Sequence, residues 1–432
     1  MNTLVIYSAA ALHTNTVRDY VEAFGRYLPS TVFFEPIEAD ESIQYSHALD
    51  LIDLVIVHYS ANFHYGYFGA TRLVRRLGEF KGTKVLFTQD DYDFTNKIKD
   101  GIAILNPDYV YSVLPDETAK AVYADEIERG IKFVNCLTGY VPKRLRGLKR
   151  KPIAERGIDV GYRGRFLPPW YGQLGFEKIG VGVEFRKLAE DTHLKTDIEW
   201  ETDKRLYGSA WDDFLSNCKT TLASESGCNV FDMDGAIRDE VFQLQRKNPA
   251  MTDQEVYEAC IAEHEGRYPL TNQISPKMFE SVAMGTPLVM FEGSYSGIFE
   301  ADRHYISLKK DFSNFDEVVS KIHDNEFLQN IADTAYEEIL VNPEYSYRHF
   351  FQSFWEHISS ECEFQDHSAV DLTERIGCKS RFVLGLDRLA ETIRIQWWGV
   401  GKSVQYLQEW GFKIWIKKVT FLLLRKFKIF AR

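Results

Sequence analysis

The feature of this chain that most limits its fold is the alternation of apolar runs with amphipathic runs over residues 1–142. Most of the amphipathic runs have the spacing of helices that bury one face, and the first of them is the next segment after the first strand. Apolar strands that alternate with helices predict a parallel sheet covered on both sides. The strands are expected at 3–8, 31–37, 54–60, 84–89, 109–115 and 132–138.

The same pattern begins again after a basic linker, 143–157. A polar helical insertion, 227–270, interrupts this second half and carries a capping box at Thr252 and Glu255. The chain is therefore predicted to be an α/β protein. It has two Rossmann-like doubly wound domains facing a cleft, 1–142 and 158–360, and then a helical tail, 361–432. The second domain is expected to have strands at 158–165, 196–201, 219–226, 287–292 and 304–308 and helices at 174–190, 315–341 and 345–360.

Charge is unevenly distributed along the chain. The net charge is −12, yet residues 394–432 hold nine Lys or Arg and one Glu, so the rest carries −20. An acidic body lacks the footprint of a nucleic-acid-binding protein, and we expect no nucleic-acid partner.

Six cysteines without a CxxC pair indicate reduced thiols in a cytoplasmic protein. No basic region precedes the first apolar run and no apolar run reaches about 18 residues, so we expect neither a signal peptide nor a transmembrane helix.

The stretch SPKMFESVAMGTPLVMFEG predicts a short helix that leads directly into a buried strand. Ser275 is a favourable N-cap, and Pro276 is the favoured first helical residue. Gly285 is the expected left-handed stop, and Pro287 prevents the helix from continuing. Glu280 lies one turn into this helix, where its carboxylate could accept hydrogen bonds from two vicinal ribose hydroxyls. The alternative is a surface glutamate that only favours the helix start.

Within this stretch, FESVAMGTPLVMFEG resembles the donor-site signature of GT-B glycosyltransferases, most closely the retaining family 4 type and the spore-maturation-type domain. The resemblance covers roughly 155–360, and the N-terminal half agrees in architecture. It implies that Glu280 holds the donor ribose. The family has another glutamate eight residues earlier, where this chain has Asn272, and Glu225 could partly replace it. This departure bears on sugar and phosphate contacts and on whether the reaction retains configuration.

The first strand of the second domain is followed by a basic, glycine-containing turn, GYRGR. Glycines let a backbone approach a phosphate, and cations neutralise a diphosphate leaving group. The resemblance places an arginine after this strand and a lysine on the next helix. The alternative is a tight turn with surface arginines. The candidate donor-binding residues here are Gly161, Arg163, Gly164, Arg165 and Lys178.

The N-terminal domain is expected to supply the acceptor site and a base. Asp90 and Asp91 follow one strand, and His58 and His64 follow another; each could take a proton from an acceptor hydroxyl. The alternative for each is a capping or supporting role.

The sequence DMDG, 232–235, is the type of Asp-x-Asp pair that binds metal in the other glycosyltransferase fold. Because GT-B enzymes generally stabilise the leaving group with cations and helix dipoles, we expect no metal or other cofactor.

The segment 410–432 plots as an amphipathic helix with aromatic and aliphatic residues on one face and basic residues on the other. That pattern is typical of a helix at an anionic membrane surface; packing on the protein itself or on a partner is the alternative. We therefore expect a peripheral membrane glycosyltransferase that transfers a sugar from a nucleotide-diphosphate sugar to a lipid-linked glycan in bacterial surface-polysaccharide (O-antigen or capsule) synthesis. A nucleotide-sugar epimerase and a non-catalytic scaffold docked at a membrane remain alternatives.

Overall fold

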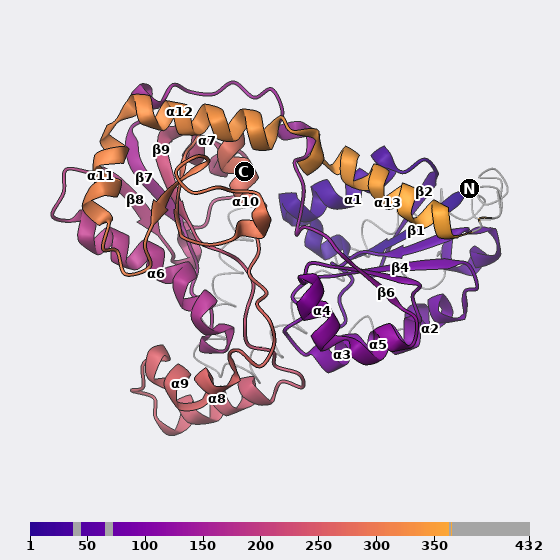
Figure 1. Ribbon diagram of the computed structural model, residues 1–432. Helices are drawn as coiled ribbons and strands as arrows, with labels where there is room; N and C mark the ends of the chain where they lie inside the picture. The colour runs from indigo at the N-terminus through magenta and orange to yellow at the C-terminus, as the bar shows by residue number, and fades with distance from the viewer. Residues whose placement is uncertain (38–44, 65–71, 363, 365–432) are drawn as a thin grey trace, which may run out of the picture. The chain divides into compact units, whose positions relative to one another are not determined.

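A computed structural model describes residues 1–37, 45–64, 72–362 and 364 (Figure 1). Nearly all of them belong to one compact unit, Met1–Ile37 with Leu49–Ser368. This unit contains two parallel sheets, each with helices on both faces, so the predicted pair of doubly wound GT-B domains is confirmed. Almost all of the predicted tail, 361–432, and its membrane-surface segment, 410–432, lie outside the described residues.

The N-terminal sheet has six parallel strands in the order β2-β1-β3-β4-β5-β6. Each begins within two residues of its predicted start, because runs of buried apolar residues define strands of this kind well. The strands are β1 Asn2–Tyr7, β2 Thr31–Pro36, β3 Leu54–Val57, β4 Thr83–Thr88, β5 Tyr109–Ser112 and β6 Lys132–Asn135. The connecting helices are η1 Ala9–His13, α1 Asn15–Tyr27, η2 Tyr45–Leu51, α2 Arg72–Glu79, α3 Thr95–Leu105, α4 Asp116–Val122 and α5 Ala124–Glu128.

The second sheet has five parallel strands in the order β11-β10-β9-β7-β8, all near their predicted positions. Its strands are β7 Ile158–Arg163, β8 Thr196–Glu199, β9 Cys218–Ala223, β10 Leu288–Phe291 and β11 Tyr305–Leu308. The helices are η5 Pro169–Tyr171, α6 Gly172–Ala189, η6 Thr202–Lys204, α7 Ser209–Asn217, α10 Lys277–Ala283, η8 Tyr295–Gly297, α11 Phe315–His323 and α12 Asn325–Ala335. The helix expected at 315–341 is interrupted because Asp324 caps the start of α12, and its end continues as a π turn, Tyr336–Leu340.

The predicted insertion forms the helix pair α8, Ala236–Lys247, and α9, Asp253–Cys260, followed by a short turn, Ala262–His264. The capping box of Thr252 and Glu255 is confirmed by reciprocal hydrogen bonds. The insertion also contacts the N-terminal domain. Asn96 donates its backbone N–H to the carbonyl of Met233 at 3.0 Å.

The last described helix, α13 Tyr347–Glu361, packs against α1 and belongs to the core of the N-terminal domain (Figure 1). The sequence assigned this segment to the second domain, and that assignment is wrong. Its apolar face brings four residues into the core next to Tyr20 and Phe24 of α1: Tyr347, Phe350, Phe351 and Phe354. The chain thus crosses between the two sheets twice, at the basic linker and before α13.

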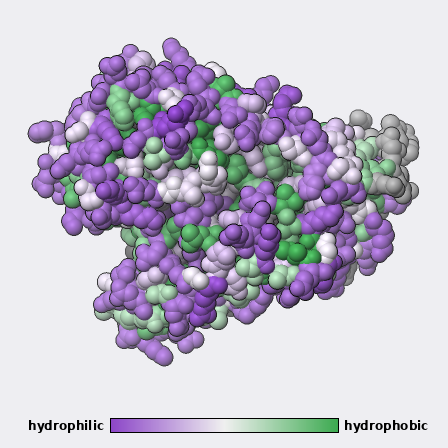
Figure 2. All heavy atoms as spheres, viewed as in Figure 1, coloured by the Kyte–Doolittle hydropathy of each residue, from purple (hydrophilic) through white to green (hydrophobic). Residues whose placement is uncertain are grey.

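The linker carries two short 3-10 turns, η3 Lys143–Leu145 and η4 Ile153–Glu155, and is anchored to the second domain by the buried Arg156. The face in Figure 2 is largely hydrophilic, and its hydrophobic groups form scattered patches. In the part of the chain that the structure describes, no helix combines the length and the apolar character needed to span a bilayer.

Candidate functional site

The strand order of the second sheet defines where a ligand binds. β7 lies between β8 and β9. The chain runs from β7 to β8 on one side and then back past β7 to β9 on the other, so a crevice is expected at the carboxyl ends of these strands. Arg165 follows β7, and Glu225 follows β9. The predicted donor site therefore falls at this edge.

Four cations at this edge act on one another electrostatically: Arg165 and Lys277 act on Lys178, and Arg165 and Arg205 act on Lys277. These four residues are here called the cation cluster. Lys178 of α6 is half-buried and donates to the Ser226 hydroxyl at 3.1 Å. Burial lowers the pKa of Lys178 to about 8, and Arg165 and Lys277 lower it further, whereas Asp90 raises it. None of the four forms an ion pair with a carboxylate within the described ranges. Such a cluster is poised for an anionic ligand.

Lys277 and Arg205 were not predicted from the sequence. Lys277 is the first residue of α10, and its side chain keeps exposed surface although desolvation around its ammonium lowers its pKa. Glu280 opposes that shift, and Arg165 and Arg205 add to it. A lysine in the first turn of a helix is disfavoured by the helix dipole. That unfavourable position is the signal by which Lys277 could have been found. The sequence carries no comparable signal for Arg205.

Glu280 is buried, with 5% of its surface exposed, and both of its carboxylate oxygens accept a hydrogen bond. The Trp211 indole N–H donates to Oε2 at 2.9 Å, and the Arg144 guanidinium donates to Oε1 at 2.9 Å. The Lys277 ammonium lies 5.4 Å from the centre of the Trp211 ring. Glu280 therefore lies next to the cation cluster and not in bulk water, as its predicted role requires.

Gly285 ends α10 as the sequence predicts, with φ of +63°. Its N–H binds the Val282 carbonyl and the next N–H binds the Ser281 carbonyl, which forms a Schellman motif. The helix begins at Lys277, and no cap from the Ser275 side chain is present. Because α10 runs into the start of β10, Gly285 lies at the amino edge of the sheet, away from the cation cluster.

The structure does not bring Arg163 into the cation cluster. Its guanidinium lies 4.1 Å from the centre of the Phe214 ring and pairs with Asp197 of β8 at 2.8 Å. Gly161 packs closely as well, since a Cβ there would come within 2.3 Å of the Cys218 sulfur. At Gly164 a Cβ would collide with the Tyr162 ring. These three residues support β7, and only Arg165 of the turn joins the cluster.

Glu225 and Asn272 are hydrogen-bonded to each other. The Asn272 amide donates to Glu225 Oε2, and its own carbonyl accepts from Asn229. Glu225 Oε1 accepts from the backbone N–H of Ser294 at 3.0 Å and of Tyr295 at 2.8 Å. Glu225 is 5% exposed, so it holds the loop after β10 in place.

Of the candidate bases, Asp90 is the one with an exposed side chain. It follows β4 with φ of +60°, accepts a hydrogen bond from the Tyr92 hydroxyl at 2.7 Å, and is close enough to Lys178 to raise its pKa. Its neighbour Asp91 is fully buried, accepts from the Tyr123 hydroxyl at 2.7 Å, and has a pKa raised by burial. Asp91 is therefore a structural residue, not a base.

The two histidines are also buried. His58 has no exposed surface, its ring centre lies 3.9 Å from that of Tyr59, and burial lowers its pKa to about 3. It stays neutral and inside the core, so its predicted role as a base is wrong. The His64 Nε2 lies 2.8 Å from the carbonyl of Asp90, which places His64 as a support for that residue.

The DMDG segment contacts backbone and side chains of the protein. Asp232 accepts from the N–H groups of Ile237 and Arg238 and so begins α8, and Asp234 accepts from the Asn96 amide at 2.7 Å. The bond between Asn96 and Asp234 joins the insertion to the N-terminal domain.

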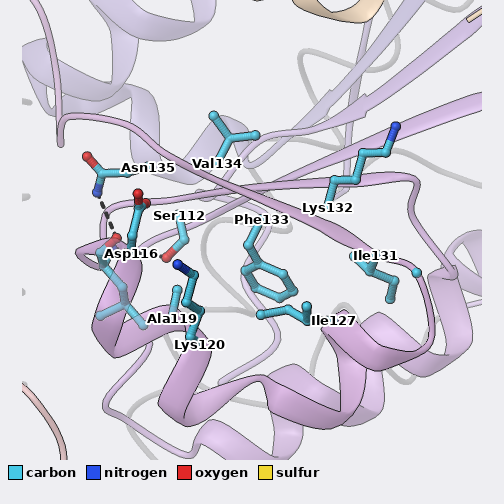
Figure 3. A pocket seen from close by; sticks show the side chains of 12 residues that line it. Ser112, Asp116, Ala119, Lys120, Ile127, Ile131, Lys132, Phe133, Val134 and Asn135 are labelled. Carbon is cyan, nitrogen blue, oxygen red and sulfur yellow. Dashed lines mark hydrogen bonds between the residues drawn. The ribbon is translucent and has the colours of Figure 1, made fainter. Parts of the chain in front are cut away.

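A separate hollow of about 470 Å³ lies at the edge of the N-terminal sheet, between β6, α4 and α5 (Figure 3). Phe133 and Ile127 form its apolar floor, and Lys120 and Asp116 lie at its rim. None of the predicted site residues lines it, so it is not part of the candidate site.

Comparisons with known proteins find a similarity of fold to solved structures. No family model matches the chain, and no curated protein matches it. An alpha-glucosyltransferase in complex with UDP-glucose and DNA is 12% identical, with a TM-score of 0.49 over 83% of this chain and 99% of its own. HepE of Anabaena in complex with UDP and glucose is 12% identical, with a TM-score of 0.44 over 83% of this chain and 100% of its own. BGT of phage T4 in complex with UDP-glucose is 11% identical, with a TM-score of 0.46 over 83% of this chain and 99% of its own.

Likeness at this level assigns no residue and no substrate to this chain. The first of these neighbours is bound to DNA. The expectation that this chain has no nucleic-acid partner stays a prediction.

Proposed function

We propose that this protein transfers a sugar from a nucleotide-diphosphate sugar to an acceptor hydroxyl. The single observation that carries the proposal is the cation cluster next to the buried Glu280, at the carboxyl edge of the second sheet. Cations without carboxylate partners can bind a diphosphate, and the neighbouring Glu280 carboxylate can accept hydrogen bonds from the vicinal hydroxyls of a ribose. The glycosyltransferases among the fold neighbours are consistent with it.

The proposed chemistry needs one base and one stabilised leaving group. The acceptor oxygen bonds to the anomeric carbon as the bond from that carbon to the diphosphate breaks. Asp90 takes the proton from the acceptor hydroxyl, and the cation cluster stabilises the charge that develops on the diphosphate. The exposed carboxylate of Asp90, near Lys178, supports this role.

Binding of nucleoside diphosphates tests the proposal. We expect one or more of UDP, GDP, ADP and CDP to raise the melting temperature; a ligand at 100 times its Kd adds about 2.7 kcal/mol of stability. Arg165→Ala and Lys277→Ala should each weaken binding about tenfold, since each removes a cation from the phosphates. Lys310→Ala, an exposed lysine paired with Glu177, is the matched control. If no nucleoside diphosphate binds the wild-type protein, the proposal fails.

The same titration carries a pH signature. Lys178, with a pKa of about 8, is mostly charged at pH 7 and mostly neutral at pH 9. Diphosphate affinity should therefore fall as pH rises over this range, roughly fivefold for the loss of one nearby charge. Lys178→Arg should abolish the dependence. Without ligand, the free energy of unfolding should rise as pH increases above 8. The folded protein loses the Lys178 proton there and with it the cost of a buried charge, whereas the unfolded chain keeps the proton to about pH 10.

We infer further that the acceptor is a lipid-linked glycan of a bacterial surface polysaccharide and that the protein acts at the membrane surface. The support is the sequence of 410–432, with basic and apolar faces. Sedimentation with anionic vesicles tests this. The full chain should bind and a chain ending at residue 409 should not; equal binding by both would contradict it.

Incubation of the donor without acceptor separates transfer from epimerisation, which needs no acceptor.

A further inference from the structure

One guanidinium connects Glu280 with two other parts of the molecule. Arg144 belongs to η3 of the linker. Its Nη2 donates to Glu280 Oε1 at 2.9 Å, and its Nε donates to Asp19 Oδ2 at 2.9 Å and Oδ1 at 3.2 Å. Asp19 lies on α1 of the N-terminal domain. The linker, α10 and α1 therefore meet at Arg144.

Two carboxylates share this single cation. Burial raises the pKa of Asp19, with Arg144 acting in the opposite direction and Glu280 adding to the rise. The pKa of Arg144 is raised: burial acts to lower it, but the pairs with Asp19 and Glu280 together outweigh that effect. The planar arginine guanidinium holds its N–H donors at fixed angles and can bind two carboxylates in a defined geometry, which a lysine ammonium cannot do.

The arrangement leaves Glu280 oriented and still able to bind. Arg144 occupies one site on Oε1, and Trp211 occupies one on Oε2. Each carboxylate oxygen has two acceptor sites, so both oxygens keep one for a hydroxyl. We propose that Arg144 is a positioning residue that fixes the Glu280 carboxylate for a ribose and, through Asp19, couples nucleotide binding to the N-terminal domain. This inference rests on the proposed function.

Ribose discrimination provides the test. The Kd of the best-binding nucleoside diphosphate is compared with that of its 2′,3′-dideoxy analogue, which lacks the hydroxyls. We expect Arg144→Ala to weaken the ribonucleotide about tenfold and the analogue little, so that the ratio of the two Kd values falls toward one. Arg144→Lys should give an intermediate ratio, and Asp19→Asn should lower the ratio about threefold, since Arg144 then loses its second anchor.

Arg146→Ala, an exposed arginine two residues along the same linker, should leave the ratio unchanged. A wild-type protein that discriminates, together with an Arg144→Ala variant that discriminates equally well, overturns the inference and leaves the proposed function standing. Should Arg144→Ala fail to fold, an unchanged ratio in both Arg144→Lys and Asp19→Asn overturns it equally. Binding of ribonucleotide and analogue with equal affinity by the wild type also overturns it, and absence of any nucleotide binding removes the proposed function as well.

Discussion

Replacing Arg156 with methionine should lower the free energy of unfolding by about 3–5 kcal/mol. Arg156 is 5% exposed, and its guanidinium donates to the carbonyls of Lys151, Cys218 and Met284 and to the Thr286 hydroxyl at 2.7–2.9 Å. Methionine fills similar space but leaves those buried acceptors unsatisfied, at about 1–3 kcal/mol each before relaxation. Denaturant unfolding followed by circular dichroism measures the change.

The matched control for that variant is Arg150→Met in the same linker. The Arg150 side chain is 30% exposed, pairs with the half-exposed Asp333 at 2.8 Å, and lies over the Tyr336 ring. A surface pair of this kind contributes about 0–1 kcal/mol, so the control should remain near wild type. Equal effects of the two substitutions would show that the buried hydrogen bonds of Arg156 do not anchor the linker.

Glu280→Gln should weaken the binding of nucleoside diphosphates about a hundredfold while leaving the fold intact. The amide keeps the shape of the carboxylate but loses its charge, so neither bond to the ribose stays charge-assisted. Its NH2 group must also face the N–H of Trp211 or of Arg144, which both donate to the carboxylate in the wild type and cannot accept. Each hydrogen bond to a charged group contributes about 1.5–3 kcal/mol. Isothermal titration calorimetry measures the loss.

Glu292→Gln is the control for Glu280→Gln. Glu292 is an exposed carboxylate directly after β10, at the same edge of the sheet. It should bind nucleotides like the wild type. If Glu280→Gln binds as tightly as Glu292→Gln, then Glu280 does not hold a ribose and the donor site lies elsewhere.

The strands could be predicted because the information that defines them is local. Buried runs such as Leu54–Val57 are apolar on both faces and are bounded by polar residues. The destination of α13 could not be predicted in this way. Its periodicity shows that one face is buried, but the partner of that face, α1, lies more than 300 residues earlier in the chain.

The site was predicted only in part, because side-chain direction depends on packing that the sequence does not display. Asp90 and Asp91 are adjacent, yet a left-handed backbone at Asp90 exposes that residue while Asp91 points into the core. Arg163 and Arg165 are two residues apart, but Arg163 is the last residue of β7 and pairs with Asp197 of β8, whereas Arg165 lies in the turn after the strand. The position of Glu280 could be predicted because the helix stop at Gly285 and the strand that follows are both visible in the sequence. Its role as a ribose ligand stays a prediction.

The return of α13 to the first sheet has a consequence for synthesis on the ribosome. Residues of the first sheet are made long before Tyr347–Glu361, the segment that completes their core. At a few to about twenty residues per second, the aromatic face that receives this helix stays uncovered on the order of ten to forty seconds in the nascent chain. During that interval the emerging polypeptide presents a surface of the type that chaperones bind, and its first half matures only after its second half has been translated.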